Sequence, residues 1–65
     1  MKITRNKAGS YTLTGHISGE LVQYTVEKMA TWWTVEKIYG SGPDFGGLYA
    51  TLSEATDSII DHSDY

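Results

Sequence analysis

The chain has 65 residues, a net charge of −3 at pH 7 and no cysteine. A chain of this length buries only about 60% of the surface that it exposes when unfolded, so it has room for one small core. The lack of cysteine excludes disulfide bonds and thiolate metal sites, and apolar runs of two or three residues exclude a membrane-spanning helix.

The charge is unevenly distributed along the chain. Residues 1–37 carry five bases and three acids, a balance of +2, whereas residues 38–65 carry five acids and no base, a balance of −5. This balance weighs against broad binding to nucleic-acid backbones, which requires several cations on one surface. No apolar run follows the charged start of the chain as it would in a targeting segment. We therefore expect a cytoplasmic location.

Four segments of the first 39 residues have the character of β-strands. Residues 1–5 form an expected edge strand, and a turn over 6–9 reverses the chain. Residues 10–17, 20–29 and 31–39 then alternate in polarity with a period of two and are rich in β-branched and aromatic residues.

The turns between these segments predict the strand register. A two-residue turn at Ser18-Gly19 pairs Leu13 with Tyr24, and one at Ala30-Thr31 pairs Tyr24 with Lys37. A longer second loop remains an alternative, because alanine and threonine do not favour a tight turn. A slip by one residue would scatter the apolar residues over both faces of the sheet. The register places nine residues on one core face: Tyr11, Leu13, Ile17, Val22, Tyr24, Val26, Trp33, Val35 and Tyr39.

The last third of the chain predicts a loop, one short extra strand and a helix. Glycine and proline mark residues 40–44 as a loop, and residues 48–50 suit a short strand. Thr51 and Glu54 form a capping-box pattern that begins the helix. We expect the helix over 51–62, with fraying of the last residues. Its core side carries Leu52, Ala55, Ile59 and Ile60, and its opposite side carries Glu54, Asp57, Asp61 and Asp64.

These elements predict one α+β domain over 1–65, with the sheet in 1–50 and the helix in 51–62. The fold is a three- to four-stranded antiparallel meander with one C-terminal helix packed on one face.

No group of residues has the pattern of an active site, a metal site or a cofactor site. His16 and His62 lack a third ligand in a defined arrangement and are interpreted as solvated. The acidic residues form a solvated stripe rather than a facing pair. The glycines match neither a phosphate-binding loop nor a dinucleotide fingerprint. We therefore expect a protein that is not an enzyme and that uses no metal and no cofactor.

The second face of the sheet is the candidate binding surface. One helix can cover only one face, so the other is solvated, or meets a partner, or is covered by the N-terminal segment or the glycine-rich loop. Clustered exposed apolar residues mark interaction sites, and tryptophan is enriched at binding hot spots. The candidate partner-binding residues are Trp32, Leu21, Met29, Ile38, Gln23 and Thr34.

Two resemblances bear on function. Residues 48–55, Leu-Tyr-Ala-Thr-Leu-Ser-Glu-Ala, resemble the helix entry of the arm-type DNA-binding domains of phage integrases and of plant AP2 domains. That resemblance implies three strands followed by a helix, and nucleic-acid binding by the sheet. The short, acidic, cysteine-free chain also resembles the small orphan proteins of bacteriophages, which implies an accessory protein that binds a host or phage protein.

The leading hypothesis is a non-enzymatic protein-binding accessory module, phage-encoded and acting on a host or phage protein or on a second copy of itself. The alternative is a small nucleic-acid-binding domain that uses the same sheet face. A third hypothesis is an acidic decoy of nucleic acid that uses the helix stripe.

Overall fold

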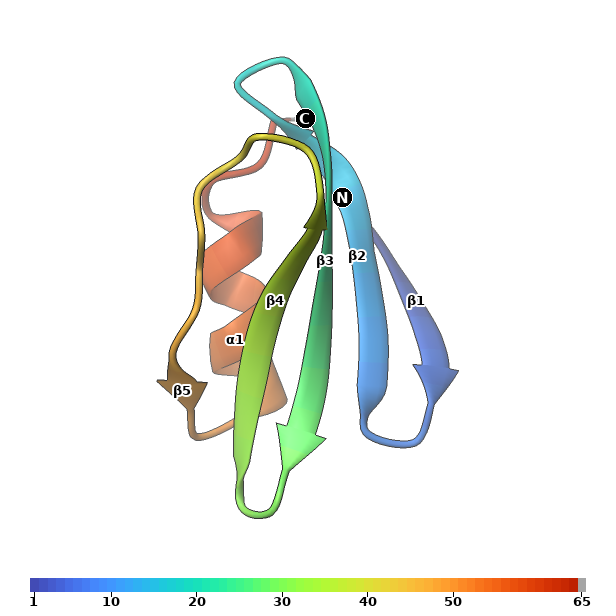
Figure 1. Ribbon diagram of the computed structural model, residues 1–65, viewed down its shortest axis with the longest axis vertical. Helices are drawn as coiled ribbons and strands as arrows, with labels where there is room; N and C mark the ends of the chain where they lie inside the picture. Colours follow the sequence, from blue (N-terminus) through green and yellow to red (C-terminus); the bar gives the residue numbers. More distant parts are fainter. Residues whose placement is uncertain (65) are drawn as a thin grey trace.

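The computed structural model describes residues 1–64 and contains an antiparallel sheet followed by one helix (Figure 1). The strands pair in chain order, β1-β2-β3-β4-β5, and α1 lies behind β4 in the view of Figure 1. The α+β meander with a C-terminal helix is confirmed, but the sheet has five strands rather than three or four, because residues 48–49 pair with β4. The elements are β1 (Lys2–Lys7), β2 (Ser10–Ile17), β3 (Glu20–Met29), β4 (Trp32–Tyr39), β5 (Leu48–Tyr49) and α1 (Leu52–Ile60).

Both predicted hairpin registers are confirmed. Tyr24 of β3 lies opposite Leu13 of β2 and opposite Lys37 of β4. The β3–β4 turn has two residues, so the alternative of a longer loop is wrong. Within this turn, Ala30 adopts a left-handed φ of 55°. Ser18 has a similar φ of 52°, but its turn continues with Gly19 at a φ of 80°, whereas the β3–β4 turn continues with Thr31. The lack of glycine explains why this turn gave the weaker sequence signal.

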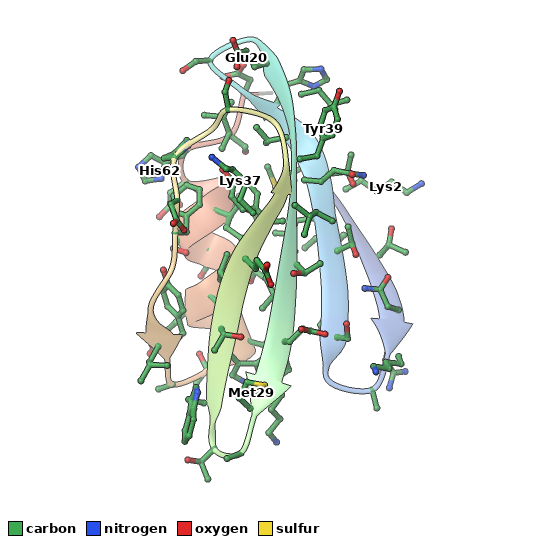
Figure 2. The ribbon with its side chains drawn as sticks, in the orientation of Figure 1. Lys2, Glu20, Met29, Lys37, Tyr39 and His62 are labelled. Atoms are coloured by element: carbon green, nitrogen blue, oxygen red, sulfur yellow. The ribbon has the colours of Figure 1, made fainter. Side chains whose placement is uncertain are left out.

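The prediction that Tyr39 belongs to the core face is wrong. The β3–β4 register shifts after the pair of Tyr24 and Lys37, so that Tyr39 lies opposite Gln23 and Ile38 is the extra residue. Such a bulge moves every later side chain of the strand to the other face. Tyr39 is accordingly 58% exposed, and Figure 2 shows it on the side of the sheet away from Lys37.

The core lies between α1 and the sheet. Ala55 and Ile59 of the helix are fully buried against the middle strands. Ile60, which the helix pattern also assigned to the core, is 38% exposed instead. Successive helix residues are about 100° apart around the axis, so Ile60 turns away when Ile59 points at the sheet. The buried apolar residues are Leu13, Ile17, Val22, Tyr24, Val26, Val35, Ala55 and Ile59.

The predicted cap of the helix is confirmed. The Thr51 hydroxyl accepts a hydrogen bond from the Glu54 backbone N–H at 3.1 Å, and the Glu54 carboxylate accepts one from the Ala50 N–H at 3.4 Å. The helix ends at Ile60, two residues before the predicted end.

The segment that follows α1 returns to the β2–β3 turn. The Asp64 carboxylate accepts hydrogen bonds from the Ser18 N–H at 3.2 Å and the Gly19 N–H at 2.6 Å. The Asp64 N–H donates to the His16 carbonyl at 2.7 Å. The residues expected to fray therefore hold the end of the helix against the far end of the sheet.

The glycine-rich loop, residues 40–47, runs along the α1 side of the sheet (Figure 1). The buried Tyr24 hydroxyl donates to the Pro43 carbonyl at 2.7 Å, and the Phe45 ring packs edge-on to the Tyr24 ring. Lys37 Nζ donates to the Gly42 carbonyl at 2.8 Å. At the start of the loop, Gly40 has a φ of 91°, and a Cβ there would lie 2.4 Å from the Leu21 carbonyl oxygen, so only glycine fits.

Candidate functional site

The face of the sheet opposite α1 is called here the open face. The sequence analysis left open whether the N-terminal segment or the glycine-rich loop covers this face. Neither does, because the N-terminal segment is strand β1 of the sheet and the glycine-rich loop lies on the α1 side. Paired residues of antiparallel strands point to the same side of a sheet, so the register identifies the members of this face. Its members in β1 to β4 are Lys2, Thr4, Lys7, Ser10, Thr12, Thr14, His16, Leu21, Gln23, Thr25, Glu27, Met29, Trp32, Thr34, Glu36 and Tyr39, and alternation along β4 from Glu36 adds the unpaired Ile38.

The six predicted binding residues all lie on the open face, but they do not form one patch. Met29 and Trp32 face each other beside the β3–β4 turn, and they are 50% and 39% exposed. Leu21 lies at the other end of β3, eight residues away, which is about 26 Å along a strand. Ile38 lies toward that same end, in the bulge.

Gln23 and Thr34 lie between the two apolar ends. Gln23 Nε2 donates to Thr14 Oγ1 at 3.1 Å across β2 and β3. Thr34 Oγ1 donates to the Glu27 carbonyl at 3.4 Å across β3 and β4. Both side chains are therefore held in place by neighbours, and the middle of the open face presents threonine, glutamine and glutamate rather than an apolar surface.

Leu48 belongs to the open face although the sequence reasoning did not select it. β5 pairs Leu48 with Thr34, which places its side chain on the same side as Met29 and Trp32. It is 73% exposed, the highest value among the large apolar side chains of residues 1–64. The signal was present in the expected strand at 48–50, but the face of that strand depends on its pairing with β4. We call Met29, Trp32 and Leu48 the apolar cluster.

The open face has a mixed charge. Glu27 and Glu36 lie near its centre, and the Glu27 carboxylate accepts a hydrogen bond from the Ser10 hydroxyl at 3.3 Å. Cations lie at its β1 margin, where Lys2 is opposite Thr14 and Lys7 is opposite Ser10. The arrangement suits a polar partner surface with one apolar anchor better than a continuous phosphate backbone.

The two histidines lie apart and in different surroundings. His16 is exposed and opposite Leu21, whereas the His62 ring packs against Phe45, with a centroid distance of 5.1 Å, and its Nδ1 is 3.0 Å from the Ser58 carbonyl oxygen. Within residues 1–64, no three His, Cys, Asp or Glu side chains are grouped so that they could hold a metal ion.

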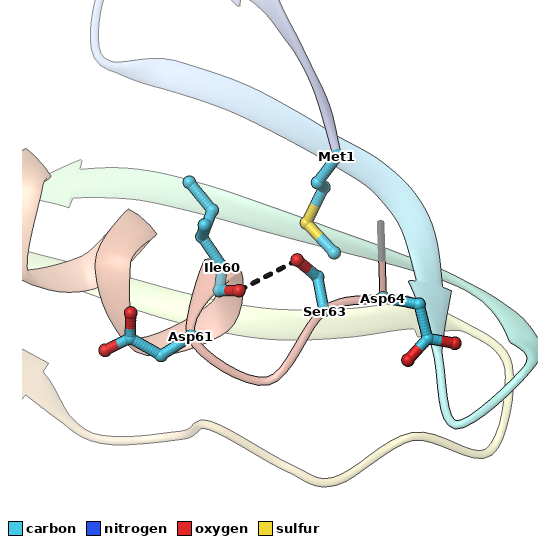
Figure 3. Close-up of a pocket in the computed structure, with 5 residues that line it drawn as sticks. All are labelled: Met1, Ile60, Asp61, Ser63 and Asp64. Atoms are coloured by element: carbon cyan, nitrogen blue, oxygen red, sulfur yellow. Dashed lines mark hydrogen bonds between the residues drawn. The ribbon is translucent and has the colours of Figure 1, made fainter.

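A hollow of about 320 Å³ lies between the start of the chain and the end of α1 (Figure 3). Met1 and Ile60 supply its apolar side, and Asp61, Ser63 and Asp64 supply its polar side. Ser63 Oγ already donates to the Ile60 carbonyl at 2.8 Å, and Asp64 is bonded to the β2–β3 turn. Ser63 and Asp64 are thus already engaged, so the open face is the stronger candidate site.

No known protein family matches this chain, and no match was found among curated proteins or solved structures. In the part of the chain that the structure describes, no helix has the length and apolar character needed to cross a membrane.

Proposed function

We propose that this domain is a non-enzymatic accessory module that binds a protein partner through the open face, with the apolar cluster as its anchor. The observation that carries the proposal is the pair of Met29 and Trp32 on an uncovered sheet face, extended by the exposed Leu48. Following the resemblance to small phage proteins, the partner would be a host or phage protein in the cytoplasm.

The composition of the cluster supports a binding role. Tryptophan and methionine are both enriched at interface cores, and tryptophan truncations are among the most costly in binding. The surrounding threonine, glutamine and glutamate side chains supply the polar rim that such an anchor requires. The cluster is too small to drive association by area alone, so binding would also depend on contacts with the surrounding polar residues.

The test compares two neighbouring tryptophans. Trp33 lies on the core side, with its ring 6.1 Å from that of Tyr11, whereas Trp32 lies on the open face. Trp32→Ala should leave thermal unfolding nearly unchanged and should weaken partner binding about 30-fold or more, as loss of a hot spot does. Trp33→Ala should instead destabilise the fold by about 2–4 kcal/mol, less than a fully buried aromatic residue would, because it is only partly buried.

The measurements are circular-dichroism melts and quantitative capture from host extract. A protein enriched by the wild type over Trp32→Ala is then purified and titrated directly, and Leu48→Ala should weaken that binding too. Sedimentation velocity tests the case in which the partner is a second copy. The proposal fails if Trp32→Ala changes neither binding nor self-association. A mobility shift with duplex DNA at low salt that is lost in Trp32→Ala would replace it by the nucleic-acid alternative.

A further inference from the structure

Strand β1 forms a free edge of the sheet. It pairs with β2 on one side only, and all six of its residues are exposed. The opposite edge differs, because β5 pairs with part of β4 and the glycine-rich loop bonds to Lys37 near the end of that strand. Alternate N–H and C=O groups on the outer side of β1 are therefore available to another extended chain, which is the basis of recognition by strand addition.

This edge is basic, although the protein as a whole is acidic. Lys2, Arg5 and Lys7 account for three of the five Lys and Arg residues of the chain. The neighbouring strand β2, SYTLTGHI, has neither an acid nor a Lys or Arg, so no carboxylate of the adjacent strand offsets these charges. The register places Lys2 with Thr14 on the open face and Arg5 with Tyr11 on the α1 side. An added strand would meet cations on both faces.

The same charges disfavour a second copy at this edge. An antiparallel copy that overlapped β1 along its full length would bring Lys2 of one chain opposite Lys7 of the other, and like charges in opposed positions destabilise a sheet. Edge lysines commonly serve this protective purpose. A purely protective edge would carry no exposed apolar side chain. Ile3, however, is 47% exposed on the α1 side of the sheet, where α1 packs mainly against β3, β4 and β5.

From the free edge, its cations and Ile3, we infer that β1 binds an acidic extended peptide segment of another protein, which adds to the sheet as a further antiparallel or parallel strand. Carboxylates of the segment pair with Lys2, Arg5 and Lys7, and an apolar side chain of the segment covers Ile3. The surface is distinct from the apolar cluster, so the inference stands or falls independently of the proposed function.

The probe is a fluorescent octapeptide of alternating glutamate and valine, titrated by anisotropy against the full chain at low salt. The matched probes are the same peptide with lysine for glutamate, the glutamate peptide N-methylated at every residue, and single-stranded oligothymidine. We expect binding of the glutamate peptide alone. Each of Lys2→Ser, Arg5→Ser and Lys7→Ser should weaken it by about two- to fivefold, the effect of one exposed ion pair.

Three results would overturn the inference. Equal binding of the lysine peptide would remove the role of charge. Equal binding of the N-methylated peptide would show electrostatic adhesion without strand addition. Tighter binding of oligothymidine, with a steep loss on adding salt, would identify the edge as a nucleic-acid surface. Trp32→Ala is the control variant and should leave the peptide affinity unchanged; a loss there would move the peptide to the open face. Slowed amide exchange in β1 on peptide binding would support the inference directly.

Discussion

At the scale of single residues, the β3–β4 turn contains backbone strain at Ala30, which a glycine at this position would relieve. Ala30 adopts a φ of 55°, where the Cβ of an L-residue crowds the backbone at a cost of about 1–2 kcal/mol. Ala30→Gly should therefore raise the free energy of unfolding by about 0.5–1 kcal/mol, because the relief of strain exceeds the entropy that glycine loses on folding.

Ala8→Gly provides the matched control for this turn substitution, since Ala8 lies in the β1–β2 turn without a positive φ. It should lower the free energy of unfolding slightly. Urea unfolding of both variants measures the difference, and a loss of stability in Ala30→Gly would contradict the assignment of strain to this turn.

At the scale of elements, the Tyr24 hydroxyl joins β3 to the glycine-rich loop. Burial raises the pKa of Tyr24 above its ordinary value of 10.0, and the nearby Asp44 carboxylate raises it further. Below that pH the phenol is neutral in both the folded and the unfolded chain. As the pH rises past 10.0, the unfolded chain releases the proton first, so the free energy of unfolding should fall until the folded pKa is also passed.

Urea unfolding between about pH 8 and about pH 11 measures this fall. Tyr24→Phe should be less stable at every pH by about 1 kcal/mol, because the hydrogen bond to the Pro43 carbonyl is lost. Its stability should nevertheless fall less steeply with pH than that of the wild type. Identical slopes in the two proteins would mean that the phenol of Tyr24 does not carry the effect.

At the scale of the whole molecule, Asp64 connects the end of the chain to a turn 45 and 46 residues earlier. The Ser18 and Gly19 N–H groups point into one left-handed turn and together form a small anion-binding nest, which the carboxylate occupies. Asp64→Ala should lower the free energy of unfolding by about 1 kcal/mol.

Asp61→Ala is the control for this contact, because Asp61 belongs to the same acidic stripe but lies at the C-terminal end of the helix, where a negative charge opposes the helix dipole. That variant should be neutral or slightly more stable. Equal losses in thermal melts of the two variants would show that the stripe, rather than the contact with the turn, matters. Because the Asp64 carboxylate is bound to the β2–β3 turn, it is not available to the acidic helix stripe that the nucleic-acid decoy hypothesis requires.

The sequence by itself determined the faces and registers of β2, of β3 and of β4 as far as Lys37. Their period-two alternation and the two short turns admit one pairing that gathers the apolar residues, so Leu13, Tyr24 and Val35 could be assigned to the core. Local signals were also enough for the N-cap of the helix, because Thr51 and Glu54 act within one turn.

Only the tertiary structure decided the features that join distant segments. The bulge that turns Tyr39 outward, the pairing that puts Leu48 opposite Thr34 on the open face, and the contact of Asp64 with Ser18 each depend on a neighbour elsewhere in the chain. Sequence periodicity reports which side a residue takes within its own element. It carries no information about which other element packs there, since that choice is made by the combined packing of the sheet, the loop and the helix.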